Sequence, residues 1–298
     1  MNFEKSPMSP DNELTSRPED GAPEELRIPL SALPIDRVNT IETKEWESLE
    51  PNSERAQEID KELATVATLF EGENINWRLD GAINISLRRG EYYREHKDLD
   101  ISILDNDVPQ FFDASRRKGY AIYYVDPSET MPVAKEQGYV KAESVTPEDV
   151  SAGKKKLILL RRDGDSYDFN SYIDVHVLEK NEGGKIIEYP GITLPDEVAI
   201  STESVQKESK DVPLQPAVVT AHHKLWSSLG RPTLNQVENY DLKDLEYLAA
   251  HLRETNPEQL EYVRSIITQI YTEQVPALKR HEQGEIDRAL KQFQKIFS

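Results

Sequence analysis

The spacing of hydrophobic residues predicts a helix soon after residue 50. Ile59, Leu63, Val66 and Phe70 fall on one face of a helical projection, and Ser53 is placed to cap the first turn. A helix with a single apolar face buries that face against another layer of the fold. We therefore expect this helix to pack on a sheet.

Short apolar stretches with β character follow this helix. They are residues 76–79, 99–104, 121–125, 157–160 and 172–178. Residues 108–118 interrupt them with a helical pattern that Gly119 ends. Residues 161–166 contain a glycine between two strand patterns, which is typical of an antiparallel hairpin. The middle of the chain is therefore predicted to be a mixed sheet with helices.

The pattern changes again after Pro213, where the β signals end. Four helical patterns follow, at residues 217–229, 236–252, 257–271 and 285–297.

At the other end of the chain, residues 1–50 are rich in proline and acidic residues, and we expect the first half of this segment to be disordered and the second half extended. The predicted fold class is α+β. Its expected regions are an N-terminal segment at 1–50, a mixed-sheet core at 51–205 and an all-helical domain at 206–298.

The negative net charge of the chain favours some classes of binding partner over others. The sequence has 36 basic and 55 acidic residues, a net charge of −19, which attracts cations and repels extended nucleic acid. The same charge could equally serve solubility alone.

There is no cysteine, so a metal would need oxygen or histidine ligands. No stretch is long and apolar enough to span a bilayer, and the first residues lack signal-peptide features, so we expect a cytoplasmic protein without membrane contact.

The most informative acidic residues are Asp98 and Asp100, on either side of Leu99. In a strand, residues i and i+2 point to the same face, where two carboxylates repel each other unless a cation lies between them. Magnesium takes carboxylate oxygens together with phosphate oxygens, which points toward nucleotide chemistry. Gly81 follows the strand pattern at 76–79 and opens a short helical stretch, so the backbone there can approach a phosphate closely.

A third carboxylate is expected, because two-metal phosphoryl chemistry needs several anionic ligands. Asp174 alternates with the apolar residues Ile173, Val175 and Val177, so its side chain should point away from theirs. It could be a metal ligand or the base that takes a proton from the substrate hydroxyl, and His176 is the next candidate for the base.

The motif that joins these residues resembles the nucleotidyltransferase superfamily, which has a polymerase-β-like core, and within it the aminoglycoside and lincosamide adenylyltransferases. The matching residues are Gly81, Ala82, Gly90, Arg94, His96, Asp98 and Asp100. Ala82 departs from the pattern, because the family usually has glycine or serine at that position.

This resemblance implies transfer of a nucleoside monophosphate, usually AMP from ATP, to a hydroxyl of a small molecule, with two Mg²⁺ ions as cofactor. The residues that it assigns to catalysis and metal binding are Asp98, Asp100 and Asp174, and those that it assigns to the nucleotide are Gly81, Ala82, Arg94, His96 and Lys224. Arg94 and His96 could instead pair with acidic residues and hold the loop, and Lys224 could be a solvated helix lysine.

Two alternatives in function stay open. A toxin-type nucleotidyltransferase would use the same core to modify tRNA or a protein, and a nucleotide-binding protein that has lost activity through Ala82 would transfer nothing. His222 and His223 are expected to be packing or surface residues, because no further histidine or cysteine stands at zinc-ligand spacing. Trp77 and Trp226 are expected in the core instead of stacking on adenine.

Overall fold

The computed structural model describes residues 24–30, 48–51, 53–94, 99–126, 136–164, 166–183, 186–187, 192–195, 203–229, 240–278 and 282–298. Its strands are β1 Glu25–Pro29, β2 Arg78–Leu79, β3 Leu99–Leu104, β4 Tyr120–Tyr124, β5 Tyr139–Ser144, β6 Lys156–Asp163, β7 Ser166–Lys180, β8 Ile186–Ile187, β9 Thr193–Leu194, β10 Ser204–Lys207 and β11 Lys210–Pro213. Its α-helices are α2 Glu54–Phe70, α3 Gly81–Arg89, α4 Val108–Arg117, α6 Pro147–Ser151, α8 Ala217–Leu229, α9 Tyr240–Thr255, α10 Pro257–Gln269 and α11 Gln283–Ile296. Shorter helical turns are η3 Asp105–Asp107, η4 Ile270–Gln274 and η5 Val275–Leu278.

The main sheet is mixed, as the sequence predicts. Its strands lie in the order β1-β5-β4-β6-β7-β3-β2, and β3 pairs with β7 in parallel while β7 pairs with β6 antiparallel. The predicted hairpin at 161–166 is the β6–β7 turn, where Asp163 pairs with Ser166. β1 pairs with β5 at one edge, so part of the N-terminal segment belongs to the sheet.

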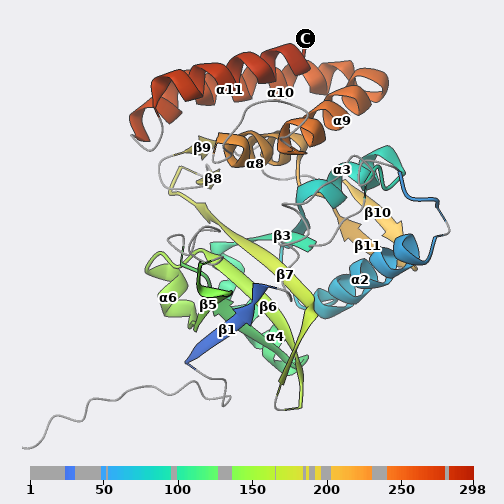
Figure 1. Cartoon of the computed structure of the whole chain (residues 1–298), viewed down its shortest axis with the longest axis vertical. Helices are drawn as coiled ribbons and strands as arrows, with labels where there is room; N and C mark the ends of the chain where they lie inside the picture. The colour runs from blue at the N-terminus through green and yellow to red at the C-terminus, as the bar shows by residue number, and fades with distance from the viewer. Residues whose placement is uncertain are drawn as a thin grey trace, which may run out of the picture.

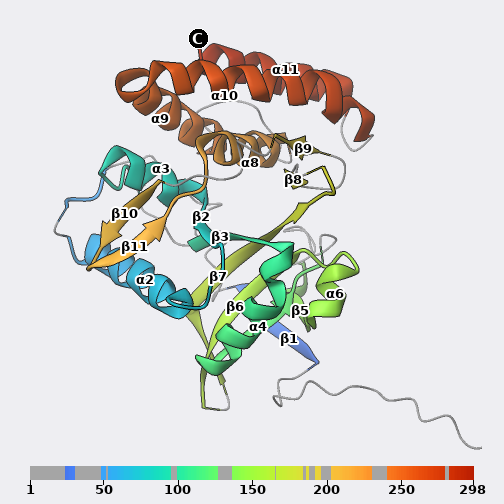
Figure 2. The same ribbon diagram turned by 180° about the vertical axis from the view of Figure 1, so that it is seen from behind.

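One face of this sheet is covered by α2 and α4. Ser53 caps α2 by accepting a hydrogen bond from the Ala56 amide, as predicted. Phe70 of α2 and Phe111 of α4 are in contact, with ring centroids 5.6 Å apart. In Figure 2, α4 crosses the strands on the side facing the viewer. The predicted helix therefore does pack on a sheet.

The helices α8 to α11 form a separate layer at one end of the sheet (Figure 1). They enclose a second hydrophobic core, and α3 contributes to both cores: Ile83 and Leu87 pack with the sheet, whereas Ala82 and Ile85 pack with the helices. The helix that follows Gly81 is thus fixed from two sides. The protein is an α+β chain with a mixed sheet and a helical C-terminal region.

The hairpin β10–β11 spans the predicted boundary at 205 and 206, and it packs with the sheet core. Val212 and Leu214 are buried in the same cluster as the inner face of α2. The division at 205 and 206 stays a prediction, and all-helical structure begins at Ala217. Within the described ranges, no helix is long and apolar enough to cross a bilayer.

Candidate functional site

A glycine turn joins β2 to α3. Gly81 has φ of +68°, and a Cβ at this position would lie 2.1 Å from Oδ2 of Asp100. The amide of Asp80 donates a hydrogen bond to the Asp100 carbonyl (2.9 Å), which ties the turn to β3. Only glycine satisfies both the backbone angle and the close approach. The turn and the Asp100 carboxylate are therefore in direct contact, as a shared site requires.

Asp100 and Asp174 are partners in the register of the parallel pair β3–β7, so their side chains share one face of the sheet. The alternate residues Ile173, Val175 and Val177 are buried on the opposite face, as the sequence predicts. Partial burial raises the pKa of Asp174, and the charge of Asp100 raises it further, against the opposing effects of Lys156 and His176. A cation between the two carboxylates would relieve this repulsion.

The donor set fits magnesium. Among the described residues no three His, Asp or Glu side chains converge as a complete metal site, and Asp98 and His96 lie outside those residues. Magnesium, however, is commonly bound by one or two carboxylates together with substrate phosphates and water. Asp100 and Asp174 supply such a pair next to a turn that can approach a phosphate. We conclude that these two residues can hold the metal and that Asp98 stays a predicted ligand.

A pair that the sequence did not indicate lies directly beside this turn. Asp80 is almost fully buried, and its carboxylate pairs with Nδ1 of His223 and accepts a hydrogen bond from the Thr220 hydroxyl (3.1 Å). Burial works to raise the pKa of Asp80, but His223 outweighs it and holds the pKa well below its usual range. His223 is buried, in agreement with the prediction of a packing residue, and α8 also brings it to Asp80 from far along the chain.

A buried ionic network links the segment after α3 to the helical layer. Asp244 accepts hydrogen bonds from the Arg94 guanidinium (3.0 and 3.1 Å) and from the Tyr93 hydroxyl (2.6 Å). The Lys224 ammonium lies 2.8 Å from Asp244 and 3.3 Å from Asp241. Burial works to raise the pKa of Asp244, but the two cations outweigh it and depress the pKa. Arg94 and Lys224, which the resemblance assigns to the nucleotide, are therefore each engaged by a buried carboxylate.

The remaining residues that the sequence analysis singled out lie in the two hydrophobic cores. Ala82 packs in the second core, so its methyl group fills space between α3 and the helices. Trp77 is buried in the first core and Trp226 packs against the second, as expected. His222 is buried near the rings of Trp226 and Tyr271, and burial lowers its pKa to about 3. It is a neutral packing residue.

Asp244→Asn is expected to lower the free energy of unfolding at neutral pH by about 3 kcal/mol, because Arg94 and Lys224 would stay buried without their counter-charge. Since the folded pKa of Asp244 is depressed, its stabilisation is complete above about pH 5 and is lost as the pH falls through that lower pKa. Urea unfolding at pH 7 and pH 3 measures this. The matched change Lys243→Ala removes an exposed ion pair with Glu246 and should lower the free energy of unfolding by about 0.5 kcal/mol or less. Equal losses of stability in the two variants would contradict the stabilising role of the buried network around Asp244.

Asp174→Asn should stabilise the metal-free protein, by about 1 kcal/mol, because it removes the cost of burying an ionised carboxylate and also its repulsion from Asp100. The folded pKa of Asp174 is raised, so its ionised form opposes folding at neutral pH. Thermal unfolding with and without Mg²⁺ tests this. Magnesium should stabilise the wild type and not the variant; stabilisation of both by magnesium would place the metal elsewhere.

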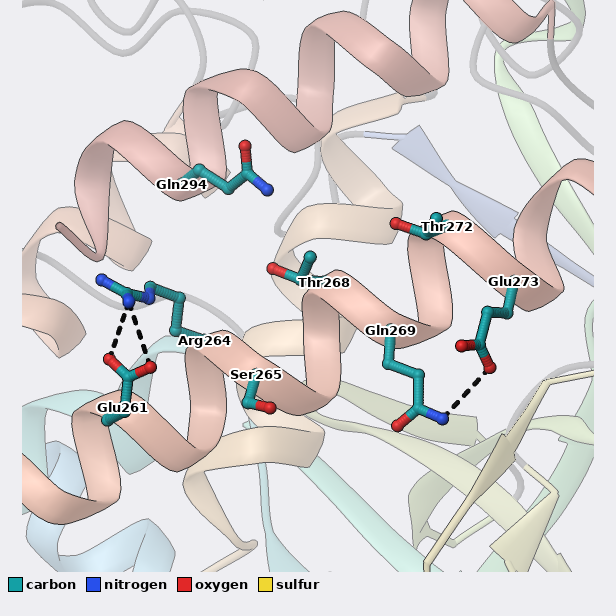
Figure 3. A pocket seen from close by; sticks show the side chains of 8 residues that line it. All are labelled: Glu261, Arg264, Ser265, Thr268, Gln269, Thr272, Glu273 and Gln294. Atoms are coloured by element: carbon teal, nitrogen blue, oxygen red, sulfur yellow. Dashed lines mark hydrogen bonds and ion pairs between the residues drawn. The ribbon is translucent and has the colours of Figure 1, made fainter.

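A groove on the helical layer lies apart from this site. It has a volume of about 620 Å³ and runs between α10 and α11 (Figure 3), lined by Glu261, Arg264, Ser265, Thr268, Gln269, Thr272, Glu273 and Gln294. Arg264 pairs with Glu261, and Gln269 donates to Glu273. The groove brings together no carboxylate pair or glycine turn, so we assign no chemistry to it.

Comparison with known proteins agrees with the geometry. A family model described as aminoglycoside-2''-adenylyltransferase matches residues 62–176, which contain the glycine turn, β3 and Asp174. A search of curated proteins found no match. Residues 62–176 are similar in sequence to the aminoglycoside-2''-adenylyltransferase family model.

Three solved structures are similar in fold. The antibiotic-resistance factor ANT(2'')-Ia in solution has 11% identity and a TM-score of 0.45, covering 72% of this chain and 94% of that one. Lincomycin-bound LnuA, a lincosamide antibiotic adenylyltransferase, has 18% identity and a TM-score of 0.39, covering 63% and 96%. ANT(2'')-Ia with adenylyl-2''-tobramycin has 11% identity and a TM-score of 0.43, covering 70% and 95%. Because these TM-scores are below 0.5, no conclusion rests on them.

Proposed function

We propose that this protein is a magnesium-dependent adenylyltransferase that transfers AMP from ATP to a hydroxyl of a small molecule. The observation that carries the proposal is the contact between the Gly81 turn and Asp100, which is paired with Asp174 across β3 and β7. A turn that approaches phosphates and two carboxylates that hold a hard cation are what nucleotidyl transfer needs in one place. We propose the cytoplasm, where ATP is available, as its location.

In this proposal, different residues bind the phosphates, hold the metal and take the proton. The amides at the start of α3 bind phosphate oxygens, because the helix N-terminus presents unpaired N–H groups and a partial positive charge. Asp100 and Asp174, with Asp98, would hold the metal, which when bound stabilises charge on the phosphoryl oxygens. In place of binding the metal, Asp174 could act as the base that takes a proton from the acceptor hydroxyl, a role that its raised pKa favours. The Tyr172 hydroxyl orients Asp174 by donating to Oδ1 (3.1 Å).

A small-molecule acceptor is favoured by two facts. The matched family model is named for aminoglycoside modification, and the net charge of −19 attracts cationic small molecules and repels tRNA. Aminoglycosides such as tobramycin are therefore the first acceptors to test, with lincomycin as a second hydroxylated antibiotic.

The test uses the full chain with ATP labelled at the α-phosphate, Mg²⁺ and separate tubes of tobramycin, lincomycin and total tRNA. Label in a small molecule supports the proposal. Label in tRNA would replace it with a toxin-type enzyme. ATP binding by calorimetry without pyrophosphate release across a wider panel of hydroxylated compounds would indicate an inactive nucleotide-binding protein.

A further inference from the structure

Lys156 begins β6 on the face of the sheet that carries the two carboxylates. In the antiparallel pair β6–β7 it is the register partner of His176, and Ile158 is the partner of Asp174. Register partners share a face, and His176 is two residues from Asp174, so the side chains of Lys156 and Asp174 lie on the same face of neighbouring strands. The flexible lysine side chain can therefore reach the space next to Asp174.

Lys156 is also electrostatically close to Asp174. Burial raises the pKa of Asp174, and among the charges that lower this pKa the ammonium of Lys156 has the largest effect, ahead of His176. Lys156 is nevertheless exposed, and it forms no ion pair within the part of the chain that the structure describes. Its ammonium is thus beside the carboxylate and accessible to a ligand.

Three other cations around the site each have a carboxylate partner. The ammonium of Lys155, the preceding residue, lies 2.6 Å from Glu179. Arg94 and Lys224, which the resemblance assigns to the nucleotide, are both paired with the buried Asp244. A triphosphate that comes close to two carboxylates is stabilised by cationic contacts in addition to the metal, because these offset the repulsion between like charges. The lysine at the start of β6 can supply such a contact.

The order of the strands places this lysine at one end of the site. Across the sheet the order is β2, β3, β7 and β6. The parts of the site follow in the same order: the Gly81 turn, Asp100, Asp174 and Lys156. In the proposed reaction the acceptor hydroxyl is activated by Asp174 or by the metal that it holds, so the α-phosphorus lies near Asp174 and the leaving phosphates lie toward the turn. Lys156 is therefore next to the phosphate that is transferred.

We propose that Lys156 binds a non-bridging oxygen of the α-phosphoryl group and stabilises its negative charge during transfer. This inference rests on the proposed function. In the transfer step the acceptor oxygen forms a bond to the α-phosphorus, the bond from that phosphorus to the bridging oxygen breaks, and the electron pair leaves with pyrophosphate. The proton of the acceptor hydroxyl passes to Asp174 or to water. The ammonium of Lys156 keeps its proton and donates a charge-assisted hydrogen bond to the phosphoryl oxygen.

The test compares ligands that contain the α-phosphate with one that lacks it. Binding of ATP and of pyrophosphate to the full chain with Mg²⁺ is measured by calorimetry, and binding of AMP by ³¹P NMR, which detects weak complexes. Lys156→Met keeps an unbranched side chain and removes the charge. It should weaken binding of ATP and AMP by about ten- to a hundredfold and leave pyrophosphate binding unchanged.

Two matched variants control for the change of charge. Lys156→Arg keeps the charge and should retain most of the affinity for ATP and AMP. Lys155→Met removes the same charge from the neighbouring position and should leave all three affinities unchanged.

A purely structural role for Lys156 gives a different result. If it only offset the charge of Asp174, Lys156→Met would alter metal binding and would therefore affect ATP and pyrophosphate alike. Equal loss for pyrophosphate, or unchanged binding of ATP and AMP, would overturn the proposal. A wild type that binds neither ATP nor pyrophosphate would instead refute the proposed function.

Discussion

Asp100→Asn is expected to lower the rate of AMP transfer by about a thousandfold, because a neutral amide no longer holds the metal that stabilises the phosphoryl oxygens, a loss of about 4 kcal/mol in the transition state. The substitution preserves the size of the side chain, and the side chain is 23% exposed, so the fold should survive. The measurement is pyrophosphate release with an acceptor identified in the labelling experiment, together with thermal unfolding of the variant.

The matched control for this change is Asp113→Asn, an exposed aspartate on the outer face of α4. It removes the same charge far from β3 and should retain wild-type activity. If Asp100→Asn and Asp113→Asn were equally active, Asp100 would not be a metal ligand.

Gly81→Ala is the second change with a large expected effect. The new Cβ would lie 2.1 Å from Oδ2 of Asp100, and the φ of +68° is strained for alanine, so the turn or the carboxylate must move. We expect the free energy of unfolding to fall by about 2 to 3 kcal/mol and transfer activity to fall by about a hundredfold or more. Urea unfolding and the transfer assay measure the two effects.

Gly72→Ala is the control for backbone strain. Gly72 has φ of +77°, but no atom lies within 4 Å of its ideal Cβ position. This variant should lose about 1 kcal/mol of stability from strain alone and keep its activity. Equal effects of the two alanines on activity would show that the contact with Asp100 has no functional consequence.

The parts of this site that follow from local pattern could be predicted. Alternation of apolar residues around Asp174 fixes which face of β7 it occupies, and the strand at 99–104 has the same bounds in the structure. Gly81 is recognisable because it lies between a strand and a helix. These features depend on neighbours in sequence, and the register of β3 and β7 then follows from burial of one face.

The parts that depend on distant segments could not be predicted. Asp80 and His223 are 143 residues apart, and Arg94 and Asp244 are 150 apart, so no periodicity connects either pair. One signal was present: Thr220 and His223 lie on one face of a helix, and Asp80 is a charged residue at the end of an apolar strand. A buried charge needs a partner, but the sequence does not say which helix supplies it.

The strands β1 and β5 were not predicted as strands for a related reason, although the second half of residues 1–50 was expected to be extended. β1 and β5 pair with each other, and their exposed and buried residues alternate over only five or six positions. Such short patterns become strands only when a partner supplies the hydrogen bonds.

The position of a bound divalent cation tests the central claim most directly. A crystal structure of the protein with a non-hydrolysable ATP analogue and Mn²⁺ in place of Mg²⁺ should show an anomalous peak about 2.1 Å from carboxylate oxygens of both Asp100 and Asp174, with the triphosphate against the Gly81 turn. A peak elsewhere, or a nucleotide bound away from that turn, would contradict it.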